Sequence, residues 1–287
     1  MRQVAREAVA GLLDDAALFP PRSASMKEAV TGHRAHLASW YGELVGPFVL
    51  PDRRLDELCR QLGAEGDASF RVSVILTDGP GALPSVLLDG TAGGSLELAG
   101  LEIPLGPSEG ALRDAREAVR LLADLPGVKG YAEVPAGESP EAVLDVLASS
   151  GAGAKLRTGG TRPSSFPSDV GVARFIVGCA ERGLPFKCTA GLHAAVRHRE
   201  PEQGVERQGF ANIVLATDAA LSGAPVEEVA CQLGERDEKA VVSALASLDP
   251  ERLRRARSQF CSFGTCSVEE PVEDLVRLGL LERPARV

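Results

Sequence analysis

The chain has 287 residues, of which 44% are hydrophobic and 25% are charged, a balance typical of a globular protein with a sizeable core. Its net charge of -9 argues against general nucleic-acid binding and against a polybasic membrane anchor, because both need a basic surface. No apolar run reaches about 18 residues, so no transmembrane helix is expected. The first seven residues lack the apolar core of a signal peptide, and the six cysteines show no zinc-type spacing. We therefore expect a cytoplasmic protein with reduced thiols.

Short β-rich runs alternate with longer amphipathic segments along the chain, which is typical of parallel βα units. Eight such runs occur, and eight strands close the common barrel. The expected strands are Ala16–Phe19, Gly46–Leu50, Arg71–Thr77, Leu98–Leu105, Gly130–Val134, Ala154–Thr158, Pro185–Thr189 and Phe260–Thr265. The predicted fold class is α/β, a single (β/α)8 TIM-type barrel domain over residues 1–287.

One connection is far longer than the others. Residues 194–258, between the seventh and eighth strands, form a predicted helical insertion, because βα connections are usually short. Helical patterns cover Gly209–Ser222, Val226–Leu233 and Glu238–Leu248. In a barrel such an insertion rises from the C-terminal face, where it serves either as a lid or as an oligomer surface, so a homo-oligomer stays open. After the eighth strand, Ser267 and Glu270 have the spacing of a capping box.

Two lysines lie on neighbouring strands at positions that alternation directs inward. Lys155 shares a face with Arg157 on the sixth strand, and Lys187 shares a face with Thr189 on the seventh. Two cations in a barrel mouth lower each other's pKa, and burial lowers it further. A lysine in that state serves as a nucleophile toward carbonyls or as a general base. The alternative is that each lysine belongs to a structural ion pair.

Acidic side chains follow the middle strands. Glu133, which shares a face with Tyr131, is the best candidate for a general acid or base, and Glu102 lies in the fourth strand region. Asp78 follows the third strand, where it is equally consistent with a turn residue before Gly79. If these three acids converge, they form an alternative site for Mg²⁺; otherwise no metal or cofactor is expected.

The loops after the sixth and seventh strands carry most of the remaining polar candidates. A local basic cluster in an acidic protein indicates an anionic substrate, a carboxylate or a phosphate. His193, just past the seventh strand, is the best imidazole for proton transfer near neutral pH. Cys266 stands near a helix start, but a buried inert thiol is the preferred interpretation. The predicted substrate-binding residues are Arg157, Thr158, Gly160, Arg162, Thr189 and Arg197.

The runs Lys155-Leu156-Arg157-Thr158-Gly159 and Lys187-Cys188-Thr189-Ala190-Gly191-Leu192 resemble the class I deoxyribose-phosphate aldolase family. That family has a Schiff-base lysine in a Lys-Thr-Ser-Thr-Gly pattern and a second lysine in a Lys-Ala-Ser-Gly-Gly-Ile pattern. The resemblance covers about forty residues and implies that Lys155 forms the imine, that Lys187 tunes it, and that Glu102 or Asp78 manages protons. Leu156, Arg157, His193 and the insertion depart from the family pattern, so the resemblance implies no particular substrate.

Three functions follow as hypotheses. The first is a lyase or aldolase-type enzyme acting on a small anionic carbonyl compound, with Lys155, Lys187, Glu133 and His193 as catalytic residues. The second is a Mg²⁺-dependent barrel enzyme that forms an enolate at Asp78, Glu102 and Glu133. The third is a barrel that binds a small acid without turning it over.

Overall fold

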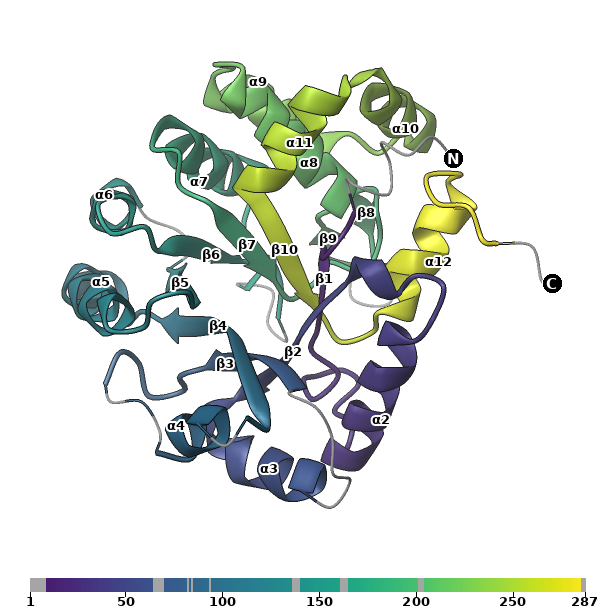
Figure 1. Cartoon of the computed structure of the whole chain (residues 1–287). Coiled ribbons are helices and arrows are strands. Elements are labelled where there is room, and N and C mark those ends of the chain that lie inside the picture. The colour runs from purple at the N-terminus through teal and green to yellow at the C-terminus, as the bar shows by residue number, and fades with distance from the viewer. Residues whose placement is uncertain are drawn as a thin grey trace.

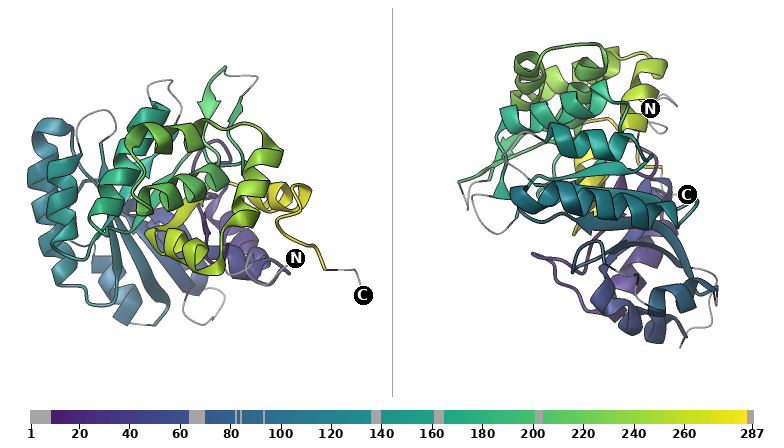
Figure 2. Two further views of the ribbon diagram at one scale, coloured as in Figure 1. Left: turned by 90° about the horizontal axis from the view of Figure 1, so that it is seen from above. Right: turned by 90° about the vertical axis from the view of Figure 1, so that its left-hand side faces the viewer.

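The computed structural model describes residues 9–63, 70–81, 83, 85–92, 94–135, 140–160, 165–200 and 204–284. Parallel strands close into a barrel in the order β1-β10-β7-β6-β5-β4-β3-β2, and helices surround it (Figures 1 and 2). This confirms the predicted (β/α)8 barrel. The barrel strands are β1 (Leu13–Asp15), β2 (Val45–Pro51), β3 (Phe70–Ile75), β4 (Leu96–Pro104), β5 (Lys129–Val134), β6 (Gly153–Arg157), β7 (Phe186–Thr189) and β10 (Phe260–Thr265). The helices up to β7 are α2 (Met26–Leu37), α3 (Leu55–Gly63), α4 (Ser85–Ala92), α5 (Ser108–Ala123), α6 (Glu141–Ala148) and α7 (Asp169–Glu181).

The first strand differs from the prediction. The expected strand Ala16–Phe19 is wrong: β1 is Leu13–Asp15, which pairs with both β10 and β2. Two consecutive acids look unlike a buried strand, yet both are buried here because each has a partner. Asp14 pairs with Lys187 and Asp15 with His33. The chain then turns, with the Phe19 amide donating to the Ala16 carbonyl, and reaches Pro20 and Pro21.

The predicted helical insertion between the seventh and eighth barrel strands is confirmed. It begins with a short hairpin, β8 (His198–Arg199) and β9 (Glu206–Arg207), followed by α8 (Phe210–Leu221), α9 (Val226–Gly234) and α10 (Glu238–Ser247). A further helix, α11 (Pro250–Gln259), was not predicted. Its sequence has few apolar positions, but Asp249 caps it by accepting from the Glu251 and Arg252 amides. Helix α8 packs against α7, α9 and α11 in the outer ring (Figure 1).

Alternation along the strands separates an apolar outer face from a polar interior. Phe186, next to Lys187 on β7, contacts Phe175 of α7 and Phe260, with ring centroids 5.4 Å apart in both pairs. The apolar clusters thus lie largely between the strands and the helices, whereas Lys155 and Lys187 point into the barrel and are direct register partners. In the described part of the chain, no helix combines the length and apolarity needed to cross a membrane.

The final helix also differs from the prediction. Helix α12 (Glu269–Arg277) has Val268 at its N-cap with no side-chain capping bond, so the capping box of Ser267 and Glu270 is absent. The Thr265 side chain hydrogen-bonds the backbone of Ser267 instead. Its hydroxyl donates to the Ser267 carbonyl at 2.9 Å and accepts from the Ser267 amide at 3.3 Å. The Glu270 side chain is therefore free for another contact.

The loops after β6 and β7 meet backbone to backbone. A Cβ on Gly159 would lie 2.9 Å from the Gly191 Cα and 3.2 Å from the Ala190 carbonyl oxygen, and neither backbone atom can move away cheaply. Ala190 and Gly191 both have positive φ, 62° and 80°, which strains the alanine. The two loops consequently have one close-fitting arrangement.

We expect Gly159→Ala to lower the free energy of unfolding by about 1–3 kcal/mol, because the new methyl group overpacks this contact. The matched control is Gly32→Ala on α2, where a Cβ meets nothing within 4 Å and alanine should add about 0.5–1 kcal/mol through helix propensity. Urea denaturation of both variants checks this. Equal stabilities would contradict the close-packed description of the loops.

Candidate active site

Glu102 is the centre of a buried charge network inside the barrel. Each of its carboxylate oxygens contacts one lysine: Oε2 lies 2.7 Å from Lys155 Nζ and Oε1 lies 2.7 Å from Lys187 Nζ. The Ser73 hydroxyl also donates to Oε1 at 2.8 Å. Burial alone would raise the pKa of Glu102, but the two ammonium groups outweigh it and hold that pKa far below its usual range. Glu102 is therefore a carboxylate throughout the physiological range.

Lys187 lies deeper in this network, between Glu102 and the first strand. Its Nζ donates to Asp14 Oδ2 at 2.5 Å, and the Tyr131 ring lies 5.5 Å away. Burial lowers the pKa of Lys187, but Asp14 and Glu102 outweigh that effect, and the net pKa is raised. The prediction that the two lysines lower each other's pKa is thus wrong for Lys187, because carboxylates separate the two cations. Asp14 itself has a raised pKa, since burial outweighs Lys187 there.

Lys155 links the network to the fifth strand. Its Nζ lies 2.8 Å from Glu133 Oε2, and the other oxygen of Glu133 accepts from Arg157 Nε, also at 2.8 Å. The two cations outweigh burial and lower the pKa of Glu133. Lys155 therefore touches two carboxylates, Glu102 and Glu133, and the cations around them keep both ionised.

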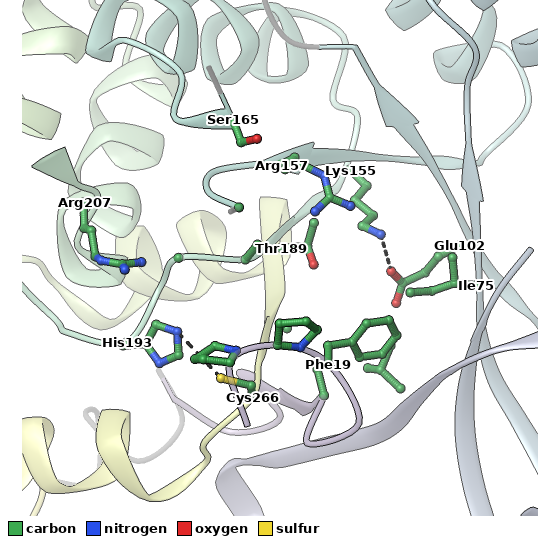
Figure 3. A pocket seen from close by; sticks show the side chains of 18 residues that line it. Phe19, Ile75, Glu102, Lys155, Arg157, Ser165, Thr189, His193, Arg207 and Cys266 are labelled. Carbon is green, nitrogen blue, oxygen red and sulfur yellow. Dashed lines mark hydrogen bonds and ion pairs between the residues drawn. The ribbon is translucent and has the colours of Figure 1, made fainter. Parts of the chain in front are cut away.

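A cavity of about 570 Å³ opens above this network at the C-terminal ends of the strands. Figure 3 shows Lys155 and Glu102 at one end of it, with Phe19 beside them. Phe19, Pro20 and Pro21 form part of its wall. Lys187 is not among the residues that line the cavity. The site is therefore layered, with one lysine facing the cavity and the other beneath.

The other end of the cavity carries a different set of groups. His193, Cys266 and Arg207 lie there, across from Lys155 (Figure 3). Arg207 belongs to β9 of the insertion, where it pairs with Glu200 at 3.0 Å and lies over the Phe166 ring. Through Arg207 the insertion supplies a cationic side chain to the cavity wall.

The predicted substrate-binding residues divide into three groups. Arg157, Gly160 and Thr189 line the cavity. Thr158 is buried and donates to the Ala190 carbonyl at 2.6 Å, so it joins the two loops, and Arg197 is buried against Asp169 and is not a lining residue. Arg162 lies outside the described residues. The sequence pattern of basic residues did not distinguish a cavity wall from a buried ion pair.

The three acids of the magnesium alternative do not converge. Asp78 has an exposed side chain, 78% accessible, that pairs with Arg53, whereas Glu102 and Glu133 face ammonium groups. Across the described ranges, no cluster of three or more His, Cys, Asp or Glu side chains is arranged as a metal site. The donor set therefore does not fit the predicted Mg²⁺ site.

Sequence reasoning missed Asp14 and Arg207 as site residues. The predicted first strand began after Asp14. Whether Asp14 reaches Lys187 depends on which strands lie beside β1 in the closed barrel. Its partner Ser262, whose hydroxyl donates to Asp14 at 2.8 Å, comes from β10, nearly the whole chain away. Arg207 lies inside the insertion, and the hydrophobic periodicity of the sequence does not predict the course of the insertion's backbone.

The network makes the protein sensitive to acid. In the unfolded chain Glu102 and Glu133 have ordinary pKa values of about 4.3, and folding lowers both. The folded state thus binds fewer protons, so this stabilisation is present above about pH 4.3 and is lost as the pH falls toward the lower folded values. The raised pKa of Asp14 acts in the opposite direction.

We expect the free energy of unfolding to fall more steeply below about pH 4.3 in the wild type than in Glu133→Gln, which lacks one of the two groups. Guanidinium denaturation at pH 7, 5, 4 and 3.5 measures both slopes. Parallel slopes would show that Glu133 does not have a lowered pKa in the folded protein.

Comparison with one solved structure supports the fold. The chain is similar to the deoxyribose-phosphate aldolase from Aeropyrum pernix, which is tetrameric, with a TM-score of 0.52 and 15% identity over 96% of this chain and 98% of that one. The carboxyl transferase domain of Rhizobium etli pyruvate carboxylase covers 98% of this chain at 14% identity, with 50% of that chain matched and a TM-score of 0.41. No family model and no curated protein sequence matches. The similarity to the aldolase structure shows the barrel fold.

Proposed function

We propose that this protein is a lyase of the aldolase type, in which Lys155 forms an imine with the carbonyl carbon of a small anionic compound. The observation that carries the proposal is the position of Lys155. Its ammonium group faces the cavity and touches the carboxylates of Glu102 and Glu133. Lys187 lies beneath and stays charged, since its pKa is raised, and it keeps Glu102 ionised.

The proposed chemistry begins when Lys155 loses a proton to water in the cavity and its free amine attacks the substrate carbonyl. Water leaves, and the cationic imine withdraws electrons from the adjacent carbon. The bond between that carbon and the next, hydroxyl-bearing carbon then breaks as the hydroxyl loses its proton, releasing an aldehyde. The enamine that is left takes up a proton at carbon, and water hydrolyses the imine to restore Lys155. His193 lies across the cavity from Lys155, and we assign to it the removal of the hydroxyl proton.

The cationic side chains of the cavity support an anionic substrate. Arg157 and Arg207 both contribute to the lining, and guanidinium groups bind carboxylates and phosphates by charge-assisted hydrogen bonds. Arg157 and Arg207 already have acidic partners, Glu133 and Glu200, so an anion would share these contacts or displace them. We propose a carboxylate or a phosphate as the anionic group.

The test is an assay of aldehyde release from a panel of β-hydroxy aldehydes and β-hydroxy ketones, each with and without a carboxylate or phosphate. We expect cleavage of at least one anionic member, unchanged by EDTA, with the neutral analogue cleaved less efficiently. Activity lost with EDTA and restored by Mg²⁺ would replace this proposal with the metal-dependent enolate mechanism. A panel member that binds in calorimetry and is never cleaved would favour a non-catalytic binding barrel.

Because the Aeropyrum pernix aldolase is tetrameric, we also propose that this chain forms a homo-oligomer. Light scattering coupled to size exclusion measures the mass directly. A mass near the chain's 30.0 kDa at all concentrations would contradict the proposal.

A further inference from the structure

Three side chains from separate elements meet at the end of the cavity away from Glu102. Cys266 follows β10, His193 follows β7, and Glu270 lies in the first turn of α12. The Cys266 Sγ atom is 3.9 Å from His193 Nε2, and His193 Nδ1 is 2.8 Å from Glu270 Oε2. Cys266 and His193 both line the cavity that Lys155 faces (Figure 3). A thiol, an imidazole and a carboxylate in this order form the arrangement of an assisted nucleophile.

The carboxylate determines which nitrogen of His193 serves as a base. A negative charge beside Nδ1 favours a proton on that nitrogen, so the lone pair of Nε2 faces the thiol. Nδ1 and the Glu270 oxygen are close but not aligned as a hydrogen bond. The Glu270 side chain is 57% exposed and is not used as a helix cap, so it can rotate into alignment.

Cys266 needs such a base. Burial raises the pKa of its thiol, and the negative charge of Glu270 raises it further, whereas the backbone of Arg22 acts in the opposite direction. At neutral pH the group is therefore a thiol, and it becomes nucleophilic only when its proton is taken during the reaction. His193 Nε2, 3.9 Å from Sγ, is placed to take that proton.

The other cysteines provide a contrast within the same molecule. Cys179 and Cys188 are fully buried between strands and helices, and burial raises the pKa of both. Cys231 is exposed on α9. Among the described residues that line the cavity, Cys266 is the one cysteine.

We propose that Cys266, His193 and Glu270 form a second reactive centre in this cavity, where the thiol adds reversibly to a small aldehyde. The bond that forms joins Sγ to the carbonyl carbon, and the π bond of the carbonyl breaks. The thiol proton passes through His193 Nε2 to the carbonyl oxygen, which gives a hemithioacetal with no net oxidation or reduction. Glu270 is a positioning residue that keeps the imidazole in its basic orientation. The step requires no imine, so it does not depend on the role of Lys155.

The experiment measures alkylation by iodoacetamide at each cysteine of the native chain, by peptide mass spectrometry over time. Exposed Cys231 serves as the internal reference, and buried Cys179 and Cys188 report any unfolding. The variants are His193→Asn, Glu270→Gln and, as the matched control for the latter, Glu269→Gln in the same helical turn. A second arm repeats the labelling with glycolaldehyde present in Lys155→Ala, which cannot form the proposed imine.

We expect His193→Asn to slow labelling of Cys266 by about tenfold or more relative to Cys231. Glu270→Gln should slow it several-fold, and Glu269→Gln should leave it unchanged. Glycolaldehyde should protect Cys266 in a concentration-dependent way and leave Cys231 unprotected. Cys266 that stays unlabelled while Cys231 reacts, a rate independent of both His193 and Glu270, or no protection by the aldehyde would each overturn the proposal.

Discussion

Glu102→Ala is expected to lower the free energy of unfolding by about 3–5 kcal/mol, because it removes the shared partner of two buried cations. Lys155 and Lys187 are almost wholly inaccessible, at 1% and 2% exposure, so both depend on their carboxylate partners. Lys187 would keep Asp14 and Lys155 would keep Glu133. Glu133 also pairs with Arg157, so without Glu102 three cations would face two carboxylates.

The matched control is Glu97→Ala on the same strand. Glu97 pairs with Arg71 at 2.9 Å, and both side chains are more than half exposed, so the expected loss is below about 1 kcal/mol. Urea denaturation at pH 7 measures both variants. If Glu102→Ala costs no more than Glu97→Ala, the buried network does not contribute to stability in the way described above.

The two lysines are expected to differ in their effect on catalysis. Lys155→Met removes the proposed nucleophile and should reduce aldehyde release by at least about 10³-fold, to background. Lys187→Met leaves the nucleophile in place and removes a cation beneath the cavity, and we expect a smaller loss of about 10²-fold in kcat. Lys129→Met is the control, because Lys129 is exposed at the start of β5.

Circular dichroism and a urea midpoint for each lysine variant separate a loss of chemistry from a loss of folding. A fully inactive Lys187→Met together with an active, folded Lys155→Met would reverse the two roles. Equal losses in both variants would contradict the layered site, in which only Lys155 faces the cavity.

Local patterns were sufficient to predict the barrel and its inward-facing lysines. Period-two alternation on β6 and β7 determines that Lys155 and Lys187 share the interior face, and both neighbours of Lys187 on the strand, Phe186 and Cys188, point outward. The long helical connection before β10 was visible as a simple excess of length. These features depend on residues close together in the chain.

The parts that failed depend on distant residues. Whether the two lysines lower each other's pKa is decided by Asp14 and Glu102, which come from β1 and β4 and whose positions follow from ring closure. The start of β1 was misplaced because its acids are buried with partners elsewhere, Lys187 and His33. Arg197 and Arg207 have the same chemistry in the sequence, and only the fold of the hairpin and α8 separates the buried residue from the one that faces the cavity.

The central claim is that Lys155 is the lysine that forms a covalent bond with a carbonyl compound. The most direct measurement is borohydride reduction with a panel of small aldehydes and keto acids, followed by intact mass and peptide mapping of the adduct. The chain has few other lysines for comparison, and Lys27, Lys129 and Lys239 are exposed. We expect a single adduct at Lys155 that persists in Lys187→Met and is absent in Lys155→Met. An adduct confined to Lys187 or to the exposed lysines, or no adduct with any compound, would contradict the account.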